Sequence, residues 1–275
     1  MSFKVKFWGV RGSIACPSPS HVMYGGNTSC VEMVLNGQSI IFDAGTGIRN
    51  LGHDFLRRNV SRAYLLLTHT HWDHINGFPF FAPIFNPDFK LDIMAGHLSD
   101  KGGIKEVLAS QMATPTFPVP FEALKADLAF IDFRAGSPLE LKDLGITVKT
   151  AYLRHPNGST AYRVEHENHS VCLVTDTEHL PGKPDENILE LIEGSDLVIY
   201  DCTYTDEEFS SHIGWGHSTW QEGVRLCRSA NVKRMAIFHH DPDHDDSFMG
   251  ALEDQARAVW DAVVVSRDNM ELTVF

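Results

Sequence analysis

The sequence contains no segment that would carry the chain into or across a membrane. Its first residues, MSFKVKFWGV, lack the apolar core of a signal peptide. No apolar run is long enough to span a bilayer, and no basic amphipathic stretch is available to bind anionic lipid. We therefore expect a cytoplasmic protein that does not associate with membranes.

Cysteine is scarce and is not arranged for pairing. The five cysteines form no CxxC pair, and their number is odd. This pattern favours free thiols over disulfides, as is usual in a reducing compartment. It agrees with the expected cytoplasmic location.

Basic residues are in deficit, with 23 Lys and Arg against 36 Asp and Glu and a formal net charge of −13. A general nucleic-acid binder needs clustered Lys and Arg to neutralise phosphates. We therefore expect that the substrate or partner is not a nucleic-acid polymer.

The composition of the 275 residues, 43% hydrophobic and 21% charged, is that of a globular protein and excludes a disordered chain. Neither an internal repeat nor a linker-like stretch is present, so we expect one domain over residues 1–275. Short apolar runs alternate with polar, helix-like stretches, which predicts a layered α/β protein. The predicted strands are 4–8, 31–35, 39–42, 63–68, 90–94, 146–153, 159–165, 170–174, 197–201, 234–238 and 272–275.

Two helices are indicated by residues that can cap their N-termini. Ser218 and Gln221 fit a capping box ahead of an apolar run. Asp245 or Asp246 can cap a second helix, which carries apolar residues at near-helical spacing through Trp260.

The segment 96–121 differs from its surroundings because MATPTFPVPF places three prolines in a short apolar stretch. Proline there disfavours both helix and strand. Two interpretations are open. The segment packs onto the core as loops, or it forms a lid or insert, an apolar cover over the functional site that could hold a base or another organic group.

Histidine is abundant, with 15 residues, and the string His69-Thr70-His71-Trp72-Asp73-His74 concentrates three of them with a carboxylate. The string follows the apolar run AYLLLT, so it leaves the end of a predicted strand. His69 and His71 then point the same way, because side chains alternate along extended chain. Borderline cations such as Zn²⁺ bind this mixture of nitrogen and oxygen ligands. The sequence therefore predicts a metal-binding loop.

This string matches HxHxDH, the signature of the metallo-β-lactamase superfamily, and the resemblance covers nearly the whole chain. Four other strings resemble further motifs of that family. They are FDAGTG (42–47), LRH (153–155), LVTDT (173–177) and IFHHDP (237–242). The resemblance implies an α/β fold, a four-layer αβ/βα sandwich. Two mixed β-sheets would pack face to face with helices outside.

The resemblance also implies a site for two divalent metal ions with a metal-bound hydroxide as nucleophile. Zn²⁺ is expected, although the all-nitrogen and oxygen ligand set does not itself select Zn²⁺ over Mn²⁺ or Fe. Asp43 would support the metal loop. One ion would be held by His69, His71 and His155, the other by Asp73, His74 and His239, with Asp176 bridging them.

The last histidine ligand has two candidates. Relatives usually read His, any residue, Ser or Asp, then Pro, which matches His239 with His240 as the variable position. We prefer His239, and His240 would serve if the preceding strand ended one residue later.

HPNGSTAYRVE (155–165) resembles the ribonuclease-Z-like phosphodiesterase branch of the superfamily, with Ala161 in place of the usual Gly. Arg163 and Glu165 in this stretch have two interpretations. They form a structural pair on the strand, or they contact substrate.

GHST (216–219) resembles the His-Ser-Thr motif of the same branch, whose His lies beside the metals and assists the leaving group. His217 would thus donate a proton to the departing oxygen, and Asp201 would orient its imidazole. The alternative is an exposed His before a helix. His217, Asp201 and the metal ligand Asp73 are the catalytic residues that the resemblance implies.

Two Gly-containing loops, FWGVRGS (7–13) and GGNTSC (25–30), could approach a phosphate through their backbone N–H groups. They could equally be turns before core strands. Arg11 in the first loop is a candidate phosphate contact.

Transfer-RNA-processing members of this branch carry a long basic arm between the later His and the bridging Asp. Here His155 and Asp176 are 21 positions apart, which leaves room for a hairpin only. The sequence therefore favours a phosphodiesterase with two metal ions that acts on a small or cyclic phosphodiester. Alternatives are a ribonuclease-Z-like RNA or DNA phosphodiesterase, a hydrolase of a lactone, thioester or lactam, and a non-catalytic metal-binding module. Because dimers are common in the branch that it resembles, we expect a homodimer.

Overall fold

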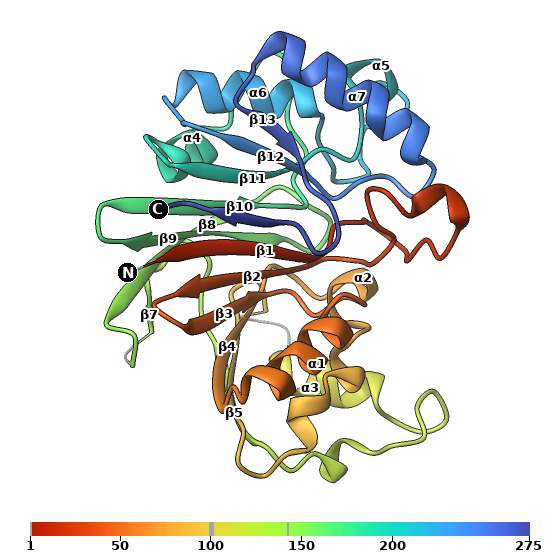
Figure 1. Ribbon diagram of the computed structural model, residues 1–275, viewed down its shortest axis with the longest axis vertical. Coiled ribbons are helices and arrows are strands. Elements are labelled where there is room, and N and C mark those ends of the chain that lie inside the picture. The colour runs from red at the N-terminus through yellow and green to blue at the C-terminus, as the bar shows by residue number, and fades with distance from the viewer. Residues whose placement is uncertain (1, 99–101, 142) are drawn as a thin grey trace.

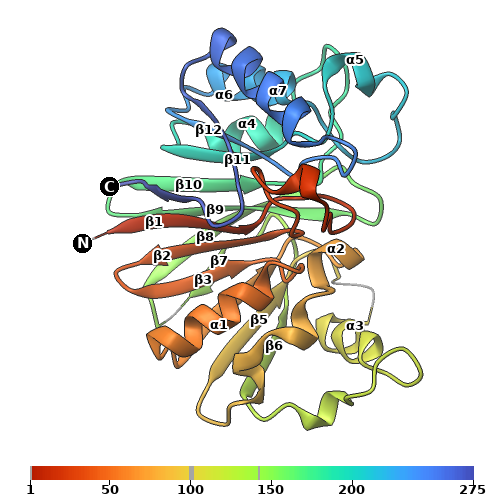
Figure 2. The ribbon, with the colours of Figure 1, turned by 45° about the vertical axis from the view of Figure 1, so that its right-hand side comes forward.

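Two β-sheets packed face to face form the centre of the computed structural model, and helices cover the outer face of each sheet (Figure 1). The structure describes residues 2–98, 102–141 and 143–275. The four layers confirm the αβ/βα sandwich expected from the sequence. In Figure 2 the two layers of helices lie at opposite ends of the stacked sheets.

The first sheet has the strand order β14-β1-β2-β3-β4-β5-β6 among the described residues. Strands β14 to β3 pair antiparallel and β3 to β6 pair parallel. The strands are β1 (Phe3–Gly9), β2 (Cys30–Leu35), β3 (Gln38–Phe42), β4 (Arg62–Leu67), β5 (Lys90–Ala95), β6 (Asp127–Asp132) and β14 (Glu271–Thr273).

The second sheet has the order β13-β12-β11-β10-β9-β8-β7, again within the described part of the chain. Strands β7 to β10 are antiparallel and β10 to β13 are parallel, so both sheets share one plan. The strands are β7 (Leu139–Leu141), β8 (Ile146–Leu153), β9 (Ser159–His166), β10 (His169–Val174), β11 (Leu197–Asp201), β12 (Met235–Phe238) and β13 (Val263–Val265).

Helices α1 (Ile48–Arg58) and α3 (Ile104–Gln111) pack on the first sheet, and α4 (Glu186–Ile192), α6 (Trp220–Ser229) and α7 (Asp246–Val259) pack on the second. The remaining helices are short and lie in loops. They are α2 (Trp72–Ile75), α5 (Asp206–Phe209) and the 3₁₀ turns η1 (Pro19–His21), η2 (Phe78–Phe80), η3 (Ala82–Phe85) and η4 (Phe121–Ala123).

Strand β4 explains why the strands read as continuous apolar runs. Its residues Ala63, Leu65 and Leu67 face the helices, whereas Tyr64 and Leu66 join the core between the sheets. Alternating side chains therefore meet an apolar layer on either side, and the strand needs no polar face.

The predicted strands are all present, but the sequence analysis missed β6, β7 and β13. β7 and β13 have three residues each, too short for a periodic signal, and β6 is a largely exposed edge strand. The segment 96–121 is not all loop, because α3 begins at Ile104. Residues 99–101 of that segment, and any lid role for them, lie outside the described residues.

The predicted cap of α6 was wrong by one position. Thr219, not Ser218, is the N-cap, and its side chain accepts from the backbone N–H of Glu222. Ser218 Oγ lies instead 2.9 Å from Nδ1 of His179 and 3.1 Å from the hydroxyl of Tyr200. For α7 the structure selects Asp245 as the cap, which accepts from Phe248 N–H.

The stretch between His155 and Asp176 is a hairpin, as expected. Strands β9 and β10 are joined by Glu167 and Asn168, whose φ angles of 49° and 68° are those of a tight two-residue turn. The connection therefore carries no arm.

Of the residues described, no helix is both long and apolar enough to cross a membrane. The five cysteines are free thiols, as the sequence analysis expected.

The two sheets are joined by hydrogen bonds at the edge where β4, β10, β11 and β12 end. Thr160 N–H donates to Thr68 O over 2.9 Å, and the buried hydroxyl of Tyr162 donates to Leu67 O over 2.6 Å. These bonds fix the end of β4, from which the histidine-rich loop departs, against the second sheet.

Replacing Tyr162 by Phe should therefore destabilise the protein. The substitution leaves Leu67 O buried without its donor, which costs about 1–3 kcal/mol in the free energy of unfolding measured by urea denaturation. Tyr152→Phe on β8, where the side chain is 54% exposed, is the matched control and should change stability by less than about 0.5 kcal/mol. Equal effects of the two substitutions would contradict this assignment.

Candidate metal centre

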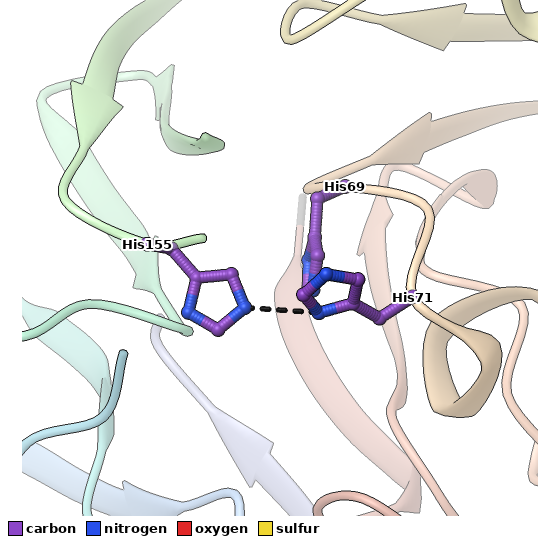
Figure 3. Close-up of side chains that lie close together, drawn as sticks. All are labelled: His69, His71 and His155. Atoms are coloured by element: carbon purple, nitrogen blue, oxygen red, sulfur yellow. Dashed lines mark hydrogen bonds between the residues drawn. The ribbon is translucent and has the colours of Figure 1, made fainter. Parts of the chain in front are cut away.

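The first group of imidazoles joins the two sheets. His69 and His71 lie in the loop after β4, and His155 follows β8 in the other sheet. Figure 3 shows the three rings turned toward one another. Nε2 of His155 lies 3.0 Å from Nδ1 of His71, and the ligand nitrogens of all three fall within 4.8 Å of one another.

The second group of side chains lies where the loop after β4, here called the metal loop (residues 68–71), leads into α2. His71 precedes this short helix, so Asp73 and His74 fall in its first turn. Nε2 of His74 lies 3.3 Å from Nε2 of His239, which follows β12. Oδ2 of Asp73 is 3.2 Å from the first of these nitrogens and 3.4 Å from the second.

Asp176, at the end of β10, lies between the two groups. Its Oδ2 is 3.6 Å from Nε2 of both His69 and His155. Its Oδ1 is 3.3 Å from Nε2 of both His74 and His239. Each carboxylate oxygen of Asp176 therefore lies beside one of the two groups of side chains, as is needed in a residue that bridges two cations.

The donor set fits divalent cations. Nε2 of His69 is buried and has no hydrogen-bond partner among the described residues. Burial lowers the pKa of His69, His71 and His155, so these imidazoles stay neutral, the form that binds metal. The buried carboxylates Asp73 and Asp176 need compensating positive charge nearby.

Asp43 supports the metal loop from beneath. Its Oδ2 lies 2.7 Å from Nδ1 of His74, which leaves Nε2 of that ring directed at the second group. The same carboxylate accepts from Thr68 N–H at 2.8 Å and from the Ser29 hydroxyl at 2.9 Å. Asp43 thus has the position that the sequence analysis expected.

Two further partners orient ligand rings and were not found from the sequence. Nδ1 of His155 lies 2.7 Å from Gly216 O. Nδ1 of His239 lies 3.0 Å from Thr203 Oγ1, which donates in turn to Asp201. A hydroxyl two residues beyond the strand-end Asp201 was the only sequence signal available for Thr203.

Three site residues have left-handed backbone conformations. Asp43, Asp176 and His239 have φ values of 60°, 60° and 62°, a region that side chains other than glycine rarely adopt. Each stands just after a strand end, where the conformation turns its side chain into the site. This conformation also occurs in turns of this chain, so it is the direction of the three side chains toward one site that makes it relevant here.

His217 lies against the second group and is not an exposed residue before a helix. Its Nδ1 is 3.1 Å from Oδ2 of the buried Asp201, and its ring stacks on that of His239 with centroids 4.9 Å apart. Burial by itself lowers the pKa of His217, but the carboxylates of Asp201, Asp176 and Asp73 together raise it to about 9. Asp201 therefore positions the imidazole and favours its protonated form.

His240 is turned away from the cluster. Its Nε2 lies 2.9 Å from Ser266 O, and burial lowers the pKa of this imidazole to about 3. The geometry therefore favours His239 over His240 as the last ligand.

Arg11 is buried, and its Nε and Nη1 donate to backbone oxygens of other loops. The fully buried guanidinium donates to Gly25 O, Asp241 O and His244 O at 2.7–2.8 Å, so it holds loops together. The expectation of a phosphate contact at Arg11 is therefore not supported by the structure.

Arg163 and Glu165 form an ion pair of 2.7 Å, and Arg163 also donates to backbone oxygens of Leu191 and Glu193. These contacts tie α4 to β9. Of the two interpretations offered by the sequence, the structural pair is the one that the contacts support.

Two glycines permit close approach to ligand rings. A Cβ at Gly12 would lie 2.3 Å from Cε1 of His239, and one at Gly216 would lie 2.4 Å from Nδ1 of His155. Next to Gly12 in the chain, the backbone N–H of Ser13 donates to Oδ2 of Asp73 over 2.7 Å. The loop 7–13 therefore meets the metal centre through a backbone donor.

The family model described as the beta-lactamase superfamily domain matches residues 38–240. The ribonuclease Z of Haloarcula marismortui is 25% identical, over 100% of this chain and 97% of the relative. The metallo-β-lactamase-fold protein YhfI of Bacillus subtilis superposes with a TM-score of 0.74 at 18% identity, over 98% of each chain. A diphosphatase of the PhnP family superposes with a TM-score of 0.71 at 17% identity, over 98% of this chain and 97% of the other. The two structural likenesses establish the fold alone.

The choice between adjacent histidines is testable by metal content. His239→Asn should weaken Zn²⁺ binding by more than the 10–100-fold that loss of an outer partner typically brings, because a ligand nitrogen is displaced. His240→Asn should retain binding. Equilibrium dialysis with elemental analysis measures the bound ion, and circular dichroism checks the fold. Loss confined to the His240 variant would reverse the assignment.

Gly216→Ala should lower metal affinity by about 10–100-fold, because the new methyl group pushes the His155 ring from its position. Gly214→Ala is a matched control. Both glycines have positive φ and share the backbone strain, but a Cβ at Gly214 meets no atom within 4 Å. An equal reduction of metal affinity in the two variants would show that backbone strain, and not the contact with His155, is responsible.

Proposed function

The chain belongs to the metallo-β-lactamase superfamily and is a hydrolase, and we propose that it is a metal-dependent phosphodiesterase for a small or cyclic phosphodiester. The observation that carries this proposal is the pair of His217 and buried Asp201 beside the bridging Asp176. Nδ1 of His217, which is paired with Asp201, is also 3.8 Å from Oδ2 of Asp176, so this imidazole stands at the edge of the ligand cluster.

The ligand groups fit two divalent cations, for which we propose Zn²⁺, with Mn²⁺ or Fe as alternatives. His69, His71 and His155 would hold one ion, and Asp73, His74 and His239 the other, with Asp176 shared. Cations there would lower the pKa of a water molecule and offset negative charge on the phosphoryl oxygens.

The residues of the chain supply the remaining functions. His217 donates a proton to the leaving oxygen, since Asp201 keeps its imidazole protonated and fixes Nδ1, which leaves Nε2 for the substrate. Asp73 is held by the Ser13 N–H, so its carboxylate keeps one orientation while the substrate binds and leaves. Asp43 and Thr203 prevent the ligand rings from rotating.

A small substrate is supported by three features of the chain. The net charge is −13, and the β9–β10 turn is short. The alignment with the Haloarcula ribonuclease Z runs to 319 positions against 275 residues of this chain, so about 44 positions are filled by the relative alone. This chain therefore lacks segments that the ribonuclease Z relative possesses.

An RNA phosphodiester is the second candidate. The similarity to ribonuclease Z extends over the full length of both chains, and the same metal groups would serve either substrate. A lactam, lactone or thioester is less well supported, because the His217–Asp201 pair is suited to protonating a leaving alkoxide.

Phosphorus NMR on a mixture of substrates distinguishes these candidates. The Zn²⁺- or Mn²⁺-loaded protein meets 3′,5′- and 2′,3′-cyclic nucleotides, a cyclic ribose phosphate, a linear diester and a short RNA. Asp73→Ala serves as the blank. Metal-dependent loss of one small diester supports the proposal, and cleavage of the RNA alone replaces it with the second candidate. Two bound ions without any phosphorus signal changing would exclude phosphodiester hydrolysis on these substrates.

The general-acid role of His217 predicts a dependence on the leaving group. His217→Ala should lower kcat by about 10²–10⁴ for a diester with an alkoxide leaving group, because that oxygen needs a proton. A p-nitrophenyl diester, whose phenolate leaves without protonation, should lose much less. Steady-state kinetics on both esters measures the difference, and an equal loss on the two would contradict the role.

Three broader expectations remain proposals: one domain over residues 1–275, a cytoplasmic location and a homodimer. Light scattering of the eluted protein during gel filtration measures the oligomeric state directly.

A further inference from the structure

A recess of about 520 Å³ adjoins the metal loop. One wall consists of Thr70, Trp72 and residues of α2 and η2, and the other of α3 and the loop after it. Figure 2 shows α2 and α3 on the same side of the molecule. Thr70 and Trp72 flank the proposed ligand His71 in the chain, so the recess lies beside the loop that carries the candidate metal ligands.

The Trp72 side chain is 83% exposed, although it stands between two proposed metal ligands. Little of this large aromatic ring packs on the described residues, so most of its surface is available to a ligand. Phe80 and Phe117 meet edge to face, with centroids 5.6 Å apart, and add further aromatic lining. Aromatic surfaces of this kind are platforms on which flat rings stack.

Among the described residues that line the recess, none has a charged side chain. Its polar members are side chains with hydroxyl or amide groups, which offer hydrogen bonds without attracting a charge. By contrast, the recess beside His179 is lined by Lys183, Asp206, Glu222 and Arg225. The polar members at the metal loop are Thr70, Asn76, Ser110, Gln111 and Thr116.

The two walls are joined to each other. Gln111 of α3 donates its side-chain amide to Ile75 O of α2 over 3.2 Å. Leu108 and Met112 of the same segment are buried in the core, whereas Val107 and Phe117 line the recess. Some residues of the segment 96–121 thus pack in the core while others line the recess, and the hydrogen bond from Gln111 holds the two walls together.

We propose that this recess binds a nucleobase of the substrate, stacked on Trp72, while the phosphodiester lies at the metal groups. The inference rests on the proposed phosphodiesterase activity and narrows its substrate to nucleotide-type diesters. A flat, neutral ring with hydrogen-bonding edges matches the aromatic, uncharged and amide-bearing lining. The volume of 520 Å³ lies within the range of pockets that hold small ligands.

Binding of adenosine tests the recess without any reaction. Adenosine carries the base and no phosphate, and ribose is the probe that lacks the base. Saturation-transfer NMR with the purified protein should detect the adenine protons and no ribose. Trp72→Ala should weaken adenosine binding about tenfold or more, as expected for one base–aromatic stack, and Trp72→Phe should restore part of it. Phe85→Ala, an exposed phenylalanine outside the recess, should not change binding.

A kinetic comparison connects the recess to hydrolysis. The ratio of kcat/KM for a p-nitrophenyl ester of thymidine 5′-phosphate to that for methyl p-nitrophenyl phosphate reports the contribution of the nucleoside. Trp72→Ala and Phe117→Ala should lower this ratio about tenfold, chiefly through KM, and Phe85→Ala should preserve it. Dividing the two rates removes any change in the metal loop that affects both esters equally.

The outcomes separate this inference from the proposed activity. If both esters are hydrolysed but the ratio is near one, or does not respond to Trp72, the recess does not bind the base and the phosphodiesterase proposal stands. If neither ester is hydrolysed and adenosine still binds in a Trp72-dependent manner, the recess is a base site and the proposed activity is wrong. Failure to bind adenosine in the wild-type protein overturns the inference.

Discussion

The buried carboxylate of Asp176 imposes the constraint on which the rest of this structure depends. A charge with 1% exposure is tolerated only beside compensating groups, and four imidazole nitrogens from the segments after three strands, β4, β8 and β12, lie 3.3–3.6 Å from its two oxygens. Strands β4, β8, β10 and β12 must therefore end at one edge, and the order of both sheets places them there. The layers of helices and the apolar core between the sheets keep these ends in place.

Much of the arrangement of the candidate site could be predicted from the sequence because its proposed ligands lie close together in the chain or follow buried strands. The arrangement of the side chains from His69 to His74 follows from local structure alone, since extended chain and a helical turn fix their directions. The short β9–β10 hairpin followed from the 21 positions that separate His155 from Asp176. The resemblance to a known family added the four-layer architecture and the ligands that lie far apart in the chain.

The rest could not be predicted because it depends on contacts between distant segments or on weak local signals. Gly216 supports His155 through a carbonyl oxygen, which every residue possesses, and Thr203 is one of many hydroxyls near a strand end. Helix α1 has no side-chain cap at its N-terminus, so no start signal marked it. Arg11 resembled a phosphate contact in a glycine-containing loop, whereas its carbonyl partners come from residues 25, 241 and 244.

The metal loop belongs to the first sheet, whereas His155, Asp176 and His239 follow strands of the second. Each proposed ion would therefore have ligands from both sheets and would act as a cross-link between the two halves of the sandwich, each a sheet with its helices. Release of the ions and separation of the halves are then thermodynamically linked processes, since a ligand that binds only the closed arrangement favours it in proportion to its concentration. The free concentration of the metal would thereby affect the free energy of unfolding as well as the activity.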